Sequence, residues 1–139
     1  MQRFVEIFSA HTLDGRAEAA TLNELAESVG WIVLQPGDSI RLDKTSHSIV
    51  ISGVTWSQPD LEVLDELANR DTGRTRVWFF NPDNVFPDDR ILPGAPRMRQ
   101  TPALAEYSGE QLVAFVQGGS ASGGVIDHIR RLFPQRAST

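Results

Sequence analysis

The residues of this chain that could carry chemistry are concentrated in one short stretch, Trp56-Ser57-Gln58-Pro59-Asp60. A serine hydroxyl and a carboxylate three positions apart could act as nucleophile and general base, but no histidine adjoins them in the sequence. The same spacing at the start of a helix suits a cap, in which a side-chain oxygen accepts a hydrogen bond from a free backbone amide. We therefore expect Ser57 or Asp60 to cap a helix, and no catalytic residue.

Metal and redox chemistry are not indicated by the remaining polar residues. The chain contains no cysteine, so it cannot by itself carry out thiol–disulfide exchange. His11, His47 and His128 lack metal-ligand spacing and have no cysteine to complete a zinc site. Asn81-Pro82-Asp83-Asn84 and Asp88-Asp89 contain no regular calcium-binding loop and are interpreted as turn residues. We expect no metal and no cofactor.

Composition narrows the class of protein. The 139 residues suit a single domain spanning residues 1–139, with ordinary hydrophobic and charged shares of 40% and 22%. A net charge of −5 argues against nucleic acid as a partner, because phosphate binding requires clustered Lys and Arg. No apolar run approaches the length of about 20 residues that spans a bilayer, and the first residues do not resemble a signal peptide. We expect a cytoplasmic protein that does not bind membranes.

The elements that must position this stretch can be predicted from periodicity. In the N-terminal part, residues 1–47, strand formers predict a strand over 4–8, and apolar spacing predicts a helix over 17–29 that Gly30 ends. The turn at Pro36-Gly37 predicts a hairpin between 31–34 and 39–42.

In the central part, residues 48–133, strands and helices alternate. A strand, a helix and a strand form a βαβ unit with parallel strands, which a Pro-rich irregular segment links to a hairpin and a last helix. Residues 134–139 are expected to fray. The predicted ranges are 48–51 (strand), 61–69 (helix), 75–80 (strand), 81–101 (irregular), 103–107 with 111–116 (hairpin) and 125–133 (helix).

This order of elements resembles the thioredoxin-like superfamily from about residue 48 to residue 133. The family's active-site turn reads Trp-Cys-x-Pro-Cys, and here Ser57 and Asp60 stand in place of the cysteines. Thr101-Pro102 begins the hairpin where the family has its cis-proline, and Gly118 follows at a similar spacing. Ile51 and Phe79 occupy the positions of the buried aspartate and lysine that serve proton transfer. The resemblance therefore implies a redox-inactive member.

The fold that the resemblance implies is α/β, with a central mixed sheet, helices on both faces and an N-terminal strand-helix-hairpin extension. Asp88-Asp89-Arg90-Ile91-Leu92 together with Thr101-Pro102-Ala103-Leu104 resembles the strand approach of KaiB-like clock proteins. The size and the lost cysteines resemble hydrogenase-maturation chaperones of the HyaE and HupG type. Both resemblances imply a protein-binding module.

By the same resemblance, Trp56–Pro59, Thr101-Pro102 and Gly118 form a groove for an extended polypeptide of a partner. A cis X-Pro bond would let Thr101 pair with a partner strand, and an exposed Trp56 would be the anchor. In the alternative, Trp56 packs on its own loop and Pro102 only shapes a turn.

The segment 82–101 is a second candidate surface. It mixes apolar side chains with Arg90, Arg97 and Arg99, a composition enriched at protein interfaces. In the alternative, its apolar residues cover the sheet and its arginines are solvated.

The function that these patterns favour is a non-catalytic adaptor, maturation chaperone or inhibitor that binds a protein through the Trp56/Pro102 groove and the 82–101 loop. Two alternatives remain open. One is a protein or transferase that binds glutathione or another small thiol through Ser57. The other is a structural subunit whose strand 4–8 pairs with a neighbour.

Overall fold

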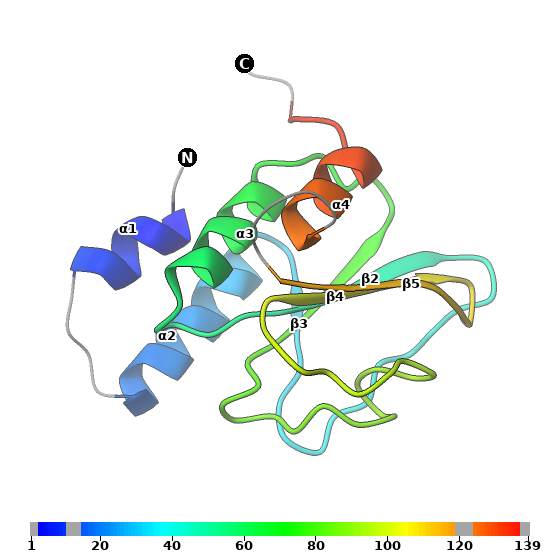
Figure 1. The fold of residues 1–139 in the computed structure, drawn as a ribbon, viewed down its shortest axis with the longest axis horizontal. Coiled ribbons are helices and arrows are strands. Elements are labelled where there is room, and N and C mark those ends of the chain that lie inside the picture. Colours follow the sequence, from blue (N-terminus) through cyan, green and yellow to red (C-terminus); the bar gives the residue numbers. More distant parts are fainter. Residues whose placement is uncertain (1–2, 11–14, 119–123, 137–139) are drawn as a thin grey trace.

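A mixed sheet of five strands runs through the described part of the chain, which in this computed structural model comprises residues 3–10, 15–118 and 124–136 (Figure 1). The strands are β1 (Ile32–Val33), β2 (His47–Ser52), β3 (Arg76–Phe80), β4 (Ala103–Ser108) and β5 (Gln111–Gln117), in the spatial order β1-β3-β2-β4-β5. β1 and β2 are parallel to β3, whereas β4 is antiparallel to both β2 and β5. The α/β class, the parallel βαβ unit and the final hairpin are confirmed.

The centre of the sheet is formed by β2, whose apolar run Ile49-Val50-Ile51 is fully buried. Its register sets Ile49 opposite Val77 and Ile51 opposite Phe79 on β3. Successive side chains of a strand point to opposite faces, so a continuous apolar run requires cover on both sides of the sheet. Each face of the sheet accordingly carries its own apolar cluster.

All four helices in the described residues pack on one face of the sheet. They are α1 (Arg3–Ala10), α2 (Gly15–Ser28), α3 (Gln58–Ala68) and α4 (Val125–Leu132). Each helix contributes to the cluster that also contains Ile49, Ile51 and Phe79. Our expectation of helices on both faces is therefore wrong for these residues. The segment between β3 and β4 carries Pro82, Pro87, Pro93 and Pro96, which cannot continue a helix.

Two long loops cover the opposite face instead, below the sheet in Figure 1. Leu34 and Ile40 come from the first loop, and Val85, Ile91 and Leu92 come from the second. The loops are joined by a hydrogen bond from the amide of Ile40 to the carbonyl of Arg90, 2.8 Å long. The apolar residues of the 81–101 segment therefore cover the sheet.

The predicted strand over 4–8 is wrong, because these residues belong to the helix α1. Phe4 is fully buried and stacks on Trp31 with 5.5 Å between ring centroids, while Glu6 is exposed. Apolar residues at 4, 5, 7 and 8 fit a helix face as well as a strand. A run of this length does not distinguish the helical period from the strand period. The edge strand that the structural-subunit alternative needs is therefore a helix.

The predicted hairpin over 31–42 is also wrong. Its turn exists, with the amide of Asp38 bonded to the carbonyl of Gln35 at 2.9 Å, but residues 39–42 form no strand. Ile32 and Val33 pair in parallel with Trp78 and Phe79 on β3. The free edge of β3 takes β1 as its partner, and the chain that follows β1 covers the loop face of the sheet.

The structure also defines the end of the second helix and of the C-terminal tail. The helix over 17–29 is confirmed as α2, and Gly30 follows it with φ +92°, a conformation that glycine adopts without strain. The expected fraying of 134–139 is wrong for 134–136, because the amide of Arg136 bonds to the carbonyl of Asn69 at 3.1 Å. Residues 137–139 lie outside the described residues.

Candidate functional site

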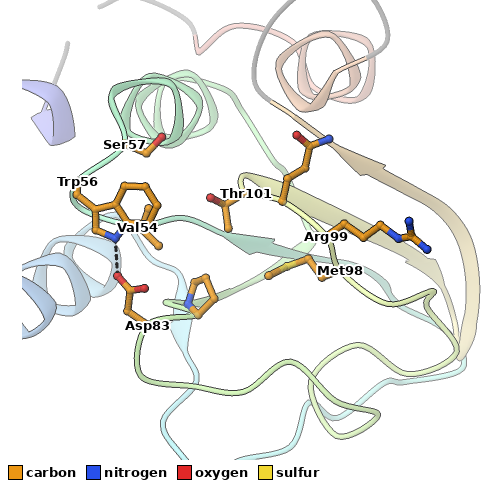
Figure 2. A pocket seen from close by; sticks show the side chains of 9 residues that line it. Val54, Trp56, Ser57, Asp83, Met98, Arg99 and Thr101 are labelled. Atoms are coloured by element: carbon orange, nitrogen blue, oxygen red, sulfur yellow. Dashed lines mark hydrogen bonds between the residues drawn. The ribbon is translucent and has the colours of Figure 1, made fainter.

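A cleft of about 470 Å³ lies beside the turn that leads from β2 into α3 (Figure 2). We call it the Trp56 cleft. β2 and β3 are parallel, so the segments that follow their carboxyl ends meet at one edge of the sheet. The segment before β4 closes the other side of the cleft. The lining residues are Val54, Trp56, Ser57, Pro82, Asp83, Met98, Arg99, Gln100 and Thr101.

Trp56 is held at this cleft and is 73% exposed. Its indole Nε1 donates a hydrogen bond to Oδ2 of Asp83, 2.8 Å away on the segment after β3. Figure 2 shows the two side chains meeting at one end of the cleft. An exposed tryptophan whose polar nitrogen is already satisfied leaves a large apolar surface available to a partner. The alternative in which Trp56 packs on its own loop does not fit this exposure.

Ser57 caps α3, as the spacing predicts. Its hydroxyl oxygen accepts from the amide of Asp60, with 3.4 Å between nitrogen and oxygen. The Ser57 hydroxyl also donates to Oδ1 of Asp60 at 2.9 Å. Ser57 and Asp60 are thus in contact, within the helix cap that their spacing predicts.

Asp60 is the polar residue that sequence reasoning undervalued. Its carboxylate is fully buried, and Oδ2 accepts from the amide of Val54 at 3.0 Å. Burial raises its pKa, and hydrogen bonds from Thr101, Val54 and Ser57 only partly offset this effect. A serine followed three residues later by an acid is a capping signature, which marks both residues in the sequence but does not reveal that Asp60 is buried.

The start of α3 has few free backbone donors. Pro59 has no amide hydrogen, the amide of Asp60 bonds to Ser57 Oγ, and the amide of Leu61 bonds to the Ser57 carbonyl at 3.1 Å. Helix N-termini bind anions through such free donors. This helix end is therefore poorly equipped to hold an anionic group.

Thr101 and Pro102 lie opposite Trp56, and the bond between them is cis. Thr101 lines the cleft, whereas Pro102 is buried beneath it. Gly118 belongs to the support of this corner, because its amide donates to the carbonyl of Pro102 at 2.9 Å. Gln58 and Pro59 are exposed on the first turn of α3 and do not line the cleft.

The three arginines of the 82–101 segment do not form one basic patch. Arg99 lines the Trp56 cleft, and Arg97 lines a neighbouring hollow of about 340 Å³ that shares Met98 with it. Arg90 lines neither and pairs with the carboxylate of Asp88 at 2.8 Å. The three arginines thus lie in three separate places, and Arg90 is neutralised locally.

A glutamine on β5 fixes one wall of the cleft, and no sequence pattern points to this role. The side-chain oxygen of Gln117 accepts from the amides of Arg99 at 2.6 Å and Gln100 at 3.2 Å. These contacts tie the segment before β4 to the edge of the sheet. The position of Arg99 is therefore set by a residue 18 positions further along the chain.

A second polar cluster lies away from the cleft. Glu106 on β4 bonds through Oε2 to His47 Nε2 at 2.8 Å and through Oε1 to His128 Nε2 at 2.9 Å. Sequence reasoning treated both histidines as isolated, because only the fold brings them together. Within the described residues no group of histidine and acidic side chains has a metal-binding arrangement, and His11 lies outside them.

Neither a scan against protein-family models nor a search of curated proteins returns a match to this chain. Among the described residues, no helix is both long enough and apolar enough to cross a membrane. The arguments for function therefore depend on the geometry of the Trp56 cleft.

Proposed function

We propose that this chain is a redox-inactive, thioredoxin-like protein that binds another protein through the Trp56 cleft, as an adaptor, maturation chaperone or inhibitor. The observation that carries the proposal is Trp56 itself, 73% exposed and fixed by Asp83 beside a cleft of about 470 Å³. Tryptophan is enriched among the residues that dominate binding energy at interfaces. A rigidly held one loses little conformational entropy on binding.

The order of elements from β2 to α4 supports the thioredoxin-like part of this proposal. It follows the strand, helix, strand, hairpin and helix order on which the resemblance rests. Ile51 and Phe79, at the positions of the family's proton-transfer pair, are fully buried within the helix-side cluster. Apolar side chains at these positions suit a scaffold without redox chemistry, because buried charges without a use cost free energy.

The 82–101 segment contributes to the proposed surface through two hollows that share Met98. Phe86, 79% exposed, lines the second hollow beside Pro96 and Arg97. The backbone of the 82–101 segment is held by turns, one of which is closed by a hydrogen bond from the amide of Leu92 to the carbonyl of Asp88, 2.7 Å long. The segment thus combines cover for the sheet with an exposed aromatic side chain.

The geometry does not favour the small-thiol alternative. A serine that holds a thiolate must donate its hydroxyl hydrogen to the sulfur. The hydroxyl of Ser57 instead donates to Asp60, and the free donors of the following helix are few. The contacts of Ser57 therefore favour protein binding over thiol binding.

The test is quantitative capture of binding proteins from the native host lysate by wild type, Trp56→Ala and Val113→Ala. Val113 is a matched control, because it is 51% exposed but lies on β5 outside the cleft. We expect a partner that Val113→Ala retains and Trp56→Ala loses by about tenfold or more, the scale of an interface hot spot. A partner set identical for wild type and Trp56→Ala would refute binding through the cleft.

A further inference from the structure

The polar part of the Trp56 cleft presents hydrogen-bond acceptors. The hydroxyl of Ser57 donates to Asp60 Oδ1 at 2.9 Å, and the Thr101 side chain also hydrogen-bonds to this carboxylate. A hydroxyl has one hydrogen and two lone pairs. Because the Ser57 hydrogen is directed at Asp60, what Ser57 can offer to a ligand is an oxygen lone pair.

Negative charge accompanies these acceptors. Asp60 lies directly behind Ser57, and Asp83 lines the same cleft. Asp60 is fully buried, whereas Asp83 lines the cleft, so Asp83 is the carboxylate that a ligand can reach. A cation beside Asp83 would be attracted to its carboxylate. The guanidinium of Arg99 extends away from the Trp56 end in Figure 2 and leaves that end acidic.

At the Ser57 side of the cleft, an anionic ligand lacks the free backbone amides that usually hold it at a helix N-terminus. The amides of Asp60 and Leu61 are already bonded within the turn, and Pro59 has none to offer. The carboxylate of Asp60 itself lies at the N-terminus of α3, where it offsets the positive end of the helix dipole. Both observations favour a ligand group that donates hydrogen bonds and carries positive charge.

Apart from Gln100, the remainder of the lining is apolar. Val54, Pro82 and Met98 line the cleft together with the exposed ring of Trp56. A chain of methylene groups packs well on such a surface, and an ammonium group gains further from the face of an indole ring. A long aliphatic stem that ends in a compact cation meets both the apolar and the acidic parts of the cleft.

We propose that the Trp56 cleft recognises a lysine side chain on an extended segment of its protein partner. The methylenes lie against Trp56, Val54 and Met98, and the ammonium group donates to Ser57 and Asp83. Lysine fits better than arginine, because three tetrahedral donors suit oxygens that lie in different directions, whereas a guanidinium fork is planar. This inference rests on the proposed function and names the residue type of the partner.

The test uses blocked heptapeptides of alternating threonine and valine with lysine, norleucine or glutamate at the centre. Binding is followed by protection of Trp56 from acrylamide quenching, since Trp31 and Trp78 are buried, and by calorimetry. We expect lysine to bind about fivefold tighter than norleucine, and glutamate to bind weakest. A further peptide without lysine but with a free amino terminus separates the side chain from a terminal amine.

Two variants sharpen the result. Asp83→Asn keeps an acceptor for the Trp56 indole but removes the charge, and it should reduce the lysine preference by about twofold to fivefold. Arg99→Gln should leave that preference unchanged or slightly larger. Equal affinities, preference for glutamate or the free amino terminus, or no peptide binding would overturn the lysine assignment. A partner captured through Trp56 would then leave the proposed function standing.

Discussion

The carboxylate of Asp65 on α3 accepts hydrogen bonds from the amide of Phe4, at 2.7 Å, and from that of Val5, at 3.0 Å. The first amides of a helix have no partner within the helix, so Asp65 caps α1 from 61 residues away. Asp65 is itself buried. One side chain therefore joins the N-terminal helix to the centre of the helical layer.

We expect Asp65→Ala to destabilise the fold by about 1 to 3 kcal/mol, the cost of leaving buried donors without a partner. Urea denaturation measures the change, and the emission of Trp31, on which Phe4 stacks, reports on the position of α1. Glu62→Ala, an exposed change on the same helix, is the control. Equal stabilities of wild type and Asp65→Ala would show that α1 does not depend on this cap.

Replacing the cap of α3 should have a smaller effect. Ser57→Ala removes the oxygen that accepts from the amide of Asp60, and such caps stabilise helices by about 1 kcal/mol. Gln58→Ala, on the exposed first turn of the same helix, should change thermal stability little. A Ser57→Ala protein as stable as Gln58→Ala would contradict the capping role.

The pairing of Glu106 with His47 and His128 predicts a pH dependence. Burial by itself raises the pKa of the Glu106 carboxyl, but the hydrogen bonds to the two histidines outweigh burial and leave it below its ordinary value. A carboxyl whose pKa is lower in the folded chain stabilises the fold above the unfolded pKa, about 4.3 for glutamate. This contribution is lost as the pH falls through the folded-state pKa.

Glu106→Gln should therefore be less stable than wild type at pH 7, by about 1 to 2 kcal/mol for a charge-assisted hydrogen bond. The difference should shrink as the pH is lowered below about 4, where the wild-type carboxyl is protonated too. Denaturation curves at several pH values measure this. A difference independent of pH would mean that the charge of Glu106 does not stabilise the fold.

The loop over the second face depends on Tyr107, whose hydroxyl donates to the carbonyl of Pro93 at 2.8 Å. Tyr107→Phe keeps the buried ring and removes this bond, which costs about 1 kcal/mol. Because the bond holds the loop, we expect faster limited proteolysis within residues 81–101 and little change within α3. Unchanged cleavage of the loop would show that its apolar residues alone hold it.

Strongly periodic segments determined their own structure. The apolar run Ile49-Val50-Ile51 predicted β2, and the strand formers before and after Gly109 predicted the β4–β5 hairpin. The helical spacing from Leu61 to Leu67 predicted α3. Each pattern has one backbone geometry that buries its apolar side chains. Residues 4–8 and 31–42 were predicted wrongly. Their runs are too short to fix a period, so packing on Trp31 and the free edge of β3 decided them.

The same division holds for the Trp56 cleft. The sequence by itself placed Trp56 and Ser57 at the start of a helix and excluded thiol–disulfide exchange by the chain's own side chains, because capping is local and cysteine is absent. Only the tertiary structure brought Asp83 to Trp56 and Gln117 to Arg99, and divided the three arginines. Trp56 and Asp83 are 27 positions apart and meet because the parallel strands β2 and β3 end at the same edge of the sheet. Arg99 and Gln117 are 18 positions apart and meet because the edge strand β5 lies beside the segment before β4.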